Sequence, residues 1–387
     1  MSNRILICRS NPISPDPRVE KEARSLVRAG YEVQLVGWDR TGVLPTTDDH
    51  QGIQCNRLQI KAKYAAGIMN LPALLRWQWG LLKWLVVNRH NYDLVHACDF
   101  DTVIPALICR SLFRKMVIYD IFDFYADHLR ATPEWIKEII RIIDYRVINS
   151  VDGIILVDDS RWQQIEKTHP KRSIVVYNSP EDFTPAKSRS ADNARNKDRS
   201  QEDSHFRVVY VGLIQKERGL IELISVFDRH PQWRLDMGGF GGDETFILEL
   251  LKGMTNVRWF GRISYEEALD LSGTADVLVA TYDPAIPNHR YSSPNKVFEA
   301  MMLGKPIVVA ENTNMDRIIK EEECGLIVTY GDPQSLESAF VDLENNLDLR
   351  KQLGVNARKA YDQKYSWKIM EGKLINFYSE LISSIRT

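Results

Sequence analysis

The sequence predicts an α/β protein of two domains, each built on a parallel β-sheet that carries helices on both faces. The first observation is that short apolar runs alternate with amphipathic segments along most of the chain, a pattern typical of helix-covered parallel sheets. The second is the length of 387 residues, which is too long for one ordinary core and suits two. The third is a break in the pattern near the middle of the chain.

The first series of expected strands lies before residue 180. Its short apolar runs are Ile5–Cys8, Val33–Trp38, Leu94–Ala97, Met116–Tyr119, Gly153–Val157 and Ile174–Tyr177. The clearest helix follows Asp16-Pro17, which supplies an N-cap residue and a first-turn proline. Apolar residues from Val19 to Val27 then share one face of that helix, and Gly30 ends it.

Residues 181–205 interrupt this pattern, because they carry mixed charge and almost no apolar side chains. We interpret them as a linker or mobile loop. A second series of strands follows, and the chain after Leu336 has the pattern of helices. The runs of the second series are Val208–Ile214, Leu235–Gly238, Val257–Phe260, Val277–Thr281, Ile307–Ala310 and Leu326–Thr329. The expected organisation is a first domain over 1–180, the linker over 181–205, a second domain over 206–365, and a C-terminal helix over 366–387 that returns to the first domain.

The composition excludes several classes of protein. Lys plus Arg (50) nearly balance Asp plus Glu (52), leaving a net charge of −2, whereas nucleic-acid-binding domains are usually basic. The five cysteines are scattered without a C-x-x-C pair, which argues against a disulfide framework or a structural zinc site. The first apolar run is too short for a signal peptide, and no run of about 18 apolar residues could span a bilayer. We therefore expect a cytoplasmic protein that binds no nucleic acid.

The most informative segment is YSSPNKVFEAMMLGKPIVVA, residues 291–310. Ser293 can cap a helix that begins at Pro294 and ends at Gly304. Unpaired N–H groups at such a helix start would point at an anion; they belong to Asn295, Lys296 and Val297. Lys296 adds a positive charge, and Glu299 could accept hydrogen bonds from both hydroxyls of a ribose. The segment indicates a nucleoside diphosphate site, and the alternative is an ordinary amphipathic helix with a surface Glu.

The same segment resembles the donor-site signature of glycosyltransferase family 4, a large retaining family, in its P-x-K-x-x-E-A-M-x-x-G-K-P form. Further matches follow in the order and spacing of the family, at residues 16–33, 92–97, 117–120, 210–219 and 259–264. The resemblance implies the GT-B fold, in which two Rossmann-like domains place their parallel sheets across a cleft. It also implies a nucleotide-sugar donor that is a substrate, no cofactor, and a saccharide or lipid-linked acceptor.

The resemblance assigns roles to single residues. Arg218, helped by Lys216, matches the basic residue that holds the donor phosphates. A glycine-rich strand end permits close approach of the nucleotide, and Ile263 matches a position whose backbone meets the base. The expected donor-binding residues are Gly212, Lys216, Gly239, Phe240, Ile263, Ser293, Pro294, Asn295, Val297 and Glu299. The chain departs from the family at Tyr291, where many members have Glu, and at Leu213, where the usual Arg is absent.

Retaining transfer requires charge to be stabilised on the departing nucleoside diphosphate. Arg218, Lys296 and the helix N–H groups could do this without a metal ion, so we expect metal-independent catalysis. Asp99 is expected to be the third catalytic residue, because Cys98 replaces a family His that often contacts the transferred sugar. The alternative for Asp99 is a helix N-cap. Asp99-Phe-Asp101 also has the spelling of a D-x-D metal motif, but it lies in the first domain.

The acceptor is expected on the first domain. The resemblance implies that the first loop, with Asp16 and Arg18, belongs to the acceptor-binding residues. Asp120 and Asp123 are further polar candidates after the next strand. His96 is expected to be a packed strand residue rather than a catalyst.

No acidic residue occurs between Asp49 and Asp93, although this stretch is basic and rich in tryptophan. The residues concerned are Arg57, Lys61, Lys63, Arg76, Trp77, Trp79, Lys83, Trp84 and Arg89. A basic, Trp-rich helix suits the surface of an anionic bilayer, so we expect peripheral contact at the inner membrane face. The alternative is a helix packed on the first sheet with its basic side chains in solvent.

Two other functions fit the same architecture. A nucleotide-sugar epimerase would bind the same donor but would need no acceptor surface. A non-catalytic sugar-nucleotide-binding protein is the third possibility, which the departures at Tyr291 and Cys98 keep open.

Overall fold

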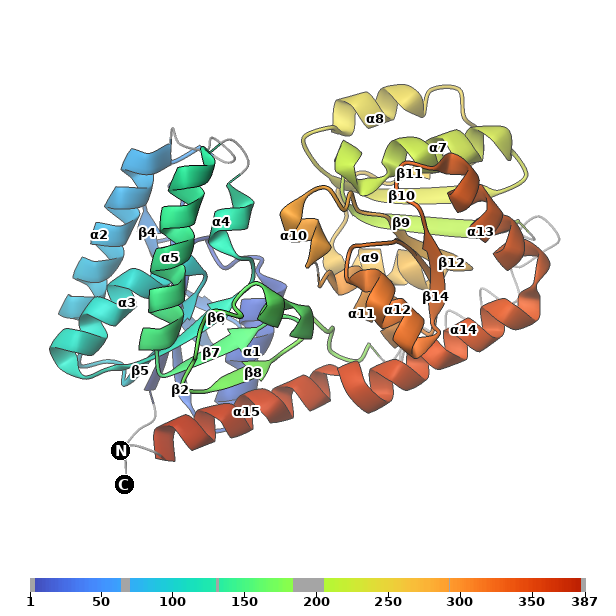
Figure 1. The fold of residues 1–387 in the computed structure, drawn as a ribbon. Helices are drawn as coiled ribbons and strands as arrows, with labels where there is room; N and C mark the ends of the chain where they lie inside the picture. The colour runs from blue at the N-terminus through green and yellow to red at the C-terminus, as the bar shows by residue number, and fades with distance from the viewer. Residues whose placement is uncertain (1–3, 64–69, 130–131, 184–204, 292, 384–387) are drawn as a thin grey trace. The chain divides into compact units, whose positions relative to one another are not determined.

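The computed structural model describes residues 4–63, 70–129, 132–183, 205–291 and 293–383. The chain divides into two compact units (Figure 1): Met1–Tyr177 with Lys368–Thr387, and Asn178–Trp367. The predicted linker falls almost entirely outside the described residues. No helix within the described ranges is long and apolar enough to cross a bilayer.

The first unit contains a sheet of eight described strands in the order β3-β4-β2-β1-β5-β6-β7-β8. Their bounds are β1 (Arg4–Arg9), β2 (Glu32–Asp39), β3 (Thr47–His50), β4 (Ile53–Gln59), β5 (Leu94–Cys98), β6 (Met116–Ile121), β7 (Gly153–Leu156) and β8 (Ser173–Val175). The predicted strands of this half are confirmed, and they pair in parallel. Strands β3 and β4 were not predicted, because they are largely polar and form an antiparallel edge.

Helices cover both faces of this sheet (Figure 1). They are α1 (Pro17–Arg28), α2 (Leu71–Val87), α3 (Phe100–Phe113), α4 (Tyr125–His128), α5 (Glu134–Ser150) and α15 (Trp367–Ser383), with a 3-10 turn at Asp159–Gln163. The core that α2, α3 and α5 share with the sheet includes Val95 and Ala97 of β5. Because side chains alternate along a strand, His96 points to the opposite face. Helix α1 begins as predicted, since Asp16 accepts the N–H of Val19.

Helix α15 comes last in the chain, yet it packs on the first sheet. Gly153 of β7 leaves space for a ring of α15, because a Cβ there would lie 2.5 Å from Phe377. Tyr378 meets His96 of β5. The C-terminal helix therefore completes the core of the first unit.

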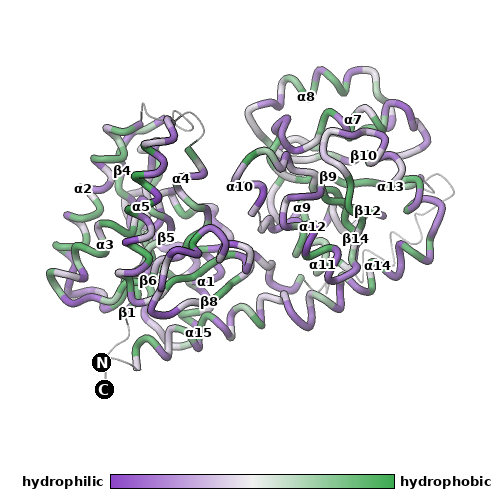
Figure 2. The backbone as a smooth tube through the Cα atoms, viewed as in Figure 1, coloured by the Kyte–Doolittle hydropathy of each residue, from purple (hydrophilic) through white to green (hydrophobic). Residues whose placement is uncertain are grey.

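The second unit contains a parallel sheet of six described strands in the order β11-β10-β9-β12-β13-β14. The strands are β9 (Arg207–Leu213), β10 (Arg234–Phe240), β11 (Val257–Trp259), β12 (Val277–Ala280), β13 (Ile307–Ala310) and β14 (Gly325–Val328), each close to a predicted run. The helices are α7 (Leu220–Arg229), α8 (Glu244–Leu250), α9 (Tyr265–Gly273), α10 (Pro287–Arg290), α11 (Asn295–Leu303), α12 (Met315–Glu322), α13 (Pro333–Asn345) and α14 (Leu347–Ala360). Figure 2 shows hydrophobic residues concentrated in strands such as β12 and β14. Two parallel-sheet α/β units confirm the predicted fold class.

Candidate active site

The connections of each sheet reverse direction between two central strands. The reversal falls between β1 and β5 in the first unit, and between β9 and β12 in the second. In open α/β sheets, ligands bind outside the carboxyl ends of the strands at such a switch point. Charged residues that were predicted from the sequence gather at both places.

Lys296 lies in the first turn of α11, and its ammonium group reaches the end of β9. Nζ lies 3.6 Å from the ring centroid of Tyr210 and 5.9 Å from that of Tyr282. This atom is buried and has no hydrogen-bond partner among the described residues. Burial, and then the charge of Arg218, lower the pKa of Lys296 well below its usual value. A buried cation without a partner is costly, so the arrangement indicates a site that an anion would complete.

Arg218 belongs to the 3-10 turn Lys216–Arg218, which leads from β9 into α7. Its guanidinium lies 3.9 Å over the ring of Tyr282, and its Nε is buried without a partner within the described chain. Gly219 ends the turn with a φ of 67°, and a Cβ there would lie 2.4 Å from Oγ1 of Thr281. Lys216 lies over the ring of Phe246 at 4.1 Å. Its help to Arg218 stays a prediction.

Two glycines shape the ends of β9 and β10. A Cβ at Gly212 would lie 2.6 Å from Cε of Lys296. A Cβ at Gly239 would lie 1.8 Å from the carbonyl oxygen of Gly212. The strands can therefore lie this close, and Lys296 can reach β9, only because both side chains are absent.

The neighbouring part of the sheet holds Phe240, which was predicted to face the nucleotide, and Ile263, whose backbone was predicted to meet the base. Phe240 is 47% exposed, and the guanidinium of Arg262 lies 4.5 Å from its ring centroid. Ile263 packs against Gly238, since a Cβ on that glycine would lie 2.9 Å from its Cδ1. Phe240 thus remains available to a ligand.

Glu299 lies one turn after Lys296 and is hydrogen-bonded by the hydroxyl of Tyr265. Tyr265 is the first residue of α9, which starts with a capping box: Ser264 accepts the N–H of Glu267, and Glu267 accepts the N–H of Ser264. Burial, then the charge of Glu299, raise the pKa of Tyr265, so its hydroxyl stays protonated and can donate. Sequence reasoning missed Tyr265, although the S-x-x-E pattern marks the helix start beside it.

The start of α11 differs from the prediction in two respects. Ser293 does not cap the helix, because Pro294 itself occupies the N-cap position in an extended conformation and the helix begins at Asn295. The Oγ of Ser293 is instead buried without a partner in the described chain. The N–H of Val297 is not free either, since it donates to the carbonyl of Pro294 at 3.2 Å, which tightens the first turn.

Asp99 follows β5 in the first unit, and its backbone is strained. Its φ of 65° and ψ of 167° fall in a region that is almost restricted to glycine and costs about 1–3 kcal/mol. Asp99 occupies the N-cap position of α3, as the alternative predicted, but its carboxylate makes no capping bond to the helix. It accepts hydrogen bonds from Arg9 and from the backbone N–H of Phe122. Burial raises the pKa of Asp99 to about 6, although the charge of Arg9 opposes that rise. Strain of this kind clusters at functional sites.

Arg9 links two of the predicted residues and was missed. It ends β1, donates to Asp99, and lies 3.0 Å from the carboxylate of Asp16. Its position could have identified it, because a charged residue at the carboxyl end of a buried strand is a candidate site residue. Asp123 accepts from Arg161 at 2.9 Å and keeps half of its side chain exposed.

Arg18 and Asp120, which were predicted to bind the acceptor, are both buried. Arg18 donates to both oxygens of Asp120 at 3.1 Å, and Nε2 of His96 lies 3.3 Å from one of them. The other ring nitrogen of His96 meets Tyr378 of α15. Burial alone would raise the pKa of Asp120, but Arg18 and His96 lower it. His96 is a packed strand residue, as predicted, whereas acceptor contact by Arg18 and Asp120 stays a prediction.

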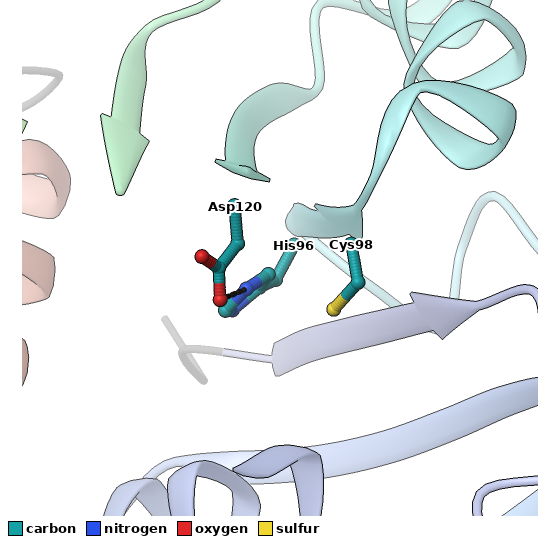
Figure 3. Close-up of side chains that lie close together, drawn as sticks. All are labelled: His96, Cys98 and Asp120. Carbon is teal, nitrogen blue, oxygen red and sulfur yellow. Dashed lines mark hydrogen bonds and ion pairs between the residues drawn. The ribbon is translucent and has the colours of Figure 1, made fainter. Parts of the chain in front are cut away.

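His96, Cys98 and Asp120 bring one donor atom each within 4.8 Å of the others (Figure 3). This spacing would suit a metal ion, but the chemistry does not. Both oxygens of Asp120 already bind the guanidinium of Arg18, and burial raises the pKa of the Cys98 thiol well above its usual range. Metal ligands must be deprotonated, so the cluster is better described as hydrogen-bonded core.

Helix α2 has two different faces. Trp77 is fully buried and stacks on Trp38 with ring centroids 5.1 Å apart. Arg57 is also buried, and pairs with Asp48 at 2.7 Å, because the unpredicted strand β4 carries it into the sheet. The packing alternative is therefore correct for Trp77, whereas Arg57 is neither in solvent nor on the helix. The outer face of α2 consists of Leu71, Leu75, Arg76, Trp79, Lys83 and Val87, all exposed.

Comparisons with known proteins define the class of protein to which this fold and these residues belong. The model of the glycosyl transferase 4-like domain matches residues 15–176, and that of the glycosyl transferases group 1 matches residues 191–360. The chain belongs to the family 4-type glycosyltransferases with the GT-B fold.

Particular relatives agree with this assignment. An uncharacterized glycosyltransferase of Methanocaldococcus jannaschii is 23% identical over 375 residues, which cover 92% of this chain and 91% of the relative. The fold is similar to that of sucrose-phosphate synthase from Thermosynechococcus elongatus, with a TM-score of 0.81 at 16% identity over 99% of this chain and 100% of that one. It is also similar to Anabaena HepE in complex with UDP-glucose, with a TM-score of 0.70 at 14% identity over 98% and 99%.

Proposed function

We propose that the protein transfers a hexose, with retention of configuration, from a UDP- or GDP-sugar to a saccharide or lipid-linked acceptor in glycan synthesis. One observation carries the donor half of this proposal. Lys296 Nζ and Arg218 Nε are buried cationic atoms without hydrogen-bond partners in the described chain, and they lie at the switch point of a parallel sheet. The UDP-glucose complex of HepE, which shares the fold, supports a nucleotide-sugar donor.

In this proposal the donor binds along α11. Lys296 and Arg218 hold the diphosphate, and Glu299 holds the ribose while Tyr265 fixes its carboxylate. The base meets the backbone of Ile263 beside Phe240. Negative charge grows on the diphosphate as its bond to the sugar breaks, and cations fixed in a dry site stabilise that charge more strongly than water does. This arrangement supports catalysis without a metal ion.

On the first unit we propose that Asp99 faces the transferred sugar or the acceptor hydroxyl. Its carboxylate is ionised at neutral pH, because its pKa of about 6 lies below that range. A carboxylate there would stabilise the positive charge that develops on the sugar ring. Asp16 and Asp123 flank it, and the buried pair of Arg18 and Asp120 would act by fixing the ends of β5 and β6.

We further propose that the outer face of α2 contacts an anionic membrane. Trp79 is 70% exposed there, beside Arg76 and Lys83. The neighbouring helices add further exposed apolar side chains: Ile108 and Leu112 on α3, and Trp135, Ile139, Ile142 and Ile143 on α5. Tryptophan favours the membrane interface, and each basic residue near an anionic surface contributes about 1 kcal/mol. Such contact would bring the enzyme to a lipid-linked acceptor.

The transfer proposal is tested by supplying a panel of UDP- and GDP-sugars, with and without a membrane extract. We expect UDP or GDP to be released only when an acceptor is present, and NMR of the product to show the anomeric configuration of the donor. An isomerised nucleotide sugar without release would identify an epimerase. Donor binding without any turnover across the panel would identify a non-catalytic protein.

A further inference from the structure

The two cations at the switch point of the second unit rest on aromatic rings. Lys296 lies on the face of Tyr210. Arg218 lies on the face of Tyr282 and is also hydrogen-bonded with its hydroxyl. No carboxylate among the described residues forms an ion pair with Lys296 or with Arg218, although the charge of Glu299 acts on Lys296 from farther away. Arg18 in the first unit, by contrast, is paired with the carboxylate of Asp120.

We propose that Tyr210 and Tyr282 are positioning residues, which hold the phosphate-binding cations in place without neutralising them. This inference rests on the proposed donor site. A carboxylate would hold Lys296 or Arg218 equally firmly, but a diphosphate would then have to displace it. An aromatic face attracts a cation through its quadrupole and carries no net charge. The ring therefore does not compete with the diphosphate for the cation.

Both rings are fixed by contacts of their own. Tyr210 is 1% exposed, and its hydroxyl donates to the carbonyl of Leu213 at 2.5 Å. Tyr282 is 6% exposed and packs against His289 of α10 with ring centroids 5.3 Å apart. Strand β9 thus supplies a platform at Tyr210 and, two residues later, the gap at Gly212 through which Lys296 reaches it.

The experiment distinguishes the contribution of the Tyr282 ring to diphosphate binding from that of its hydroxyl. Calorimetry would measure the affinity of UDP and GDP for the wild type, Tyr282→Phe and Tyr282→Leu, with Tyr282→Met as a second variant that lacks the ring. We expect Tyr282→Phe, which loses only the hydrogen bond between Arg218 and the hydroxyl, to keep most of the affinity, and the two ring-less variants to lose roughly tenfold. Uridine or guanosine, which carry no phosphate, should bind all four proteins equally by NMR titration. Circular dichroism would confirm that each variant is folded.

A double-mutant cycle tests whether Tyr282 acts through Arg218. In an Arg218→Met background, Tyr282→Leu should cause no further loss of diphosphate affinity. The inference is overturned if the ring-less variants keep wild-type affinity, if the nucleoside loses as much affinity as the diphosphate, or if the two losses simply add. Failure of the wild type to bind UDP and GDP would instead overturn the proposed donor site.

Discussion

Trp77 and Trp79 lie two residues apart on α2, but one is buried and the other exposed. Replacement by alanine should therefore affect stability at Trp77 and membrane contact at Trp79. Trp77 is buried against Trp38 and donates its indole N–H to the carbonyl of Asp101 at 2.9 Å. Replacing it with alanine removes a large core side chain and the stacked pair, which should lower the free energy of unfolding by about 3–5 kcal/mol. The carbonyl of Asp101 keeps Gln78 as a second donor, so no orphaned acceptor adds to this loss.

Trp79→Ala is the matched control. Its side chain is 70% exposed, so its loss should change stability by less than about 0.5 kcal/mol. It should nevertheless reduce co-sedimentation with anionic vesicles. Urea unfolding followed by far-UV circular dichroism gives the first quantity, and vesicle binding at low salt gives the second. A stable Trp77→Ala variant would refute the description of the core, and unchanged vesicle binding by Trp79→Ala would refute the membrane face.

The other predictions concern charge. Arg76→Glu with Lys83→Glu should weaken vesicle binding at least thirtyfold, since two basic residues contribute about 2 kcal/mol; equal binding by this variant would argue against an electrostatic contact. Glu299→Ala should weaken UDP or GDP binding by about ten- to a hundredfold through loss of charge-assisted hydrogen bonds to the ribose, and unchanged affinity in calorimetry would remove that assignment. Chelation by EDTA should leave turnover nearly intact; loss of activity that magnesium or manganese restores would contradict catalysis by Lys296 and Arg218 alone. Because the pKa of Asp99 is about 6, its carboxylate becomes neutral as the pH falls through that value, so the transfer rate should fall on the acid side. Asp99→Asn should be slow and lack this limb, whereas a limb that persists would belong to another group.

Most strands and the donor-site helix α11 could be predicted from the sequence. Buried parallel strands consist of short apolar runs, and proline and glycine mark the ends of helices. Strands β3 and β4 were not predicted, since an antiparallel edge needs few apolar residues. The burial of Arg57, which lies on β4, was therefore not predicted either. Ser293 looked like an N-cap, but the proline after it takes that position. In each case a local pattern was overruled by the residues around it.

Contacts between segments that are distant along the chain could not be predicted from the sequence. Tyr210, Tyr282 and Lys296 come from a strand, a loop and a helix spread over 87 positions, and nothing in their spacing brings them together. Arg9 and Asp99 meet only because β1 and β5 are neighbours in the sheet. The strained backbone of Asp99 is likewise invisible in a sequence, because aspartate has no marked preference for that conformation.

The placement of α15 has a consequence for how the protein is made on the ribosome. The second unit is continuous in sequence, from Asn178 to Trp367, whereas the first unit needs residues from both ends of the chain. Its sheet is synthesised early. The ring that packs on Gly153 and the hydroxyl that bonds His96 belong to Phe377 and Tyr378, which are synthesised near the end. The part synthesised first should therefore be the last to mature. Trimming the chain after Trp367 should leave the later unit intact and the earlier one open to proteolysis.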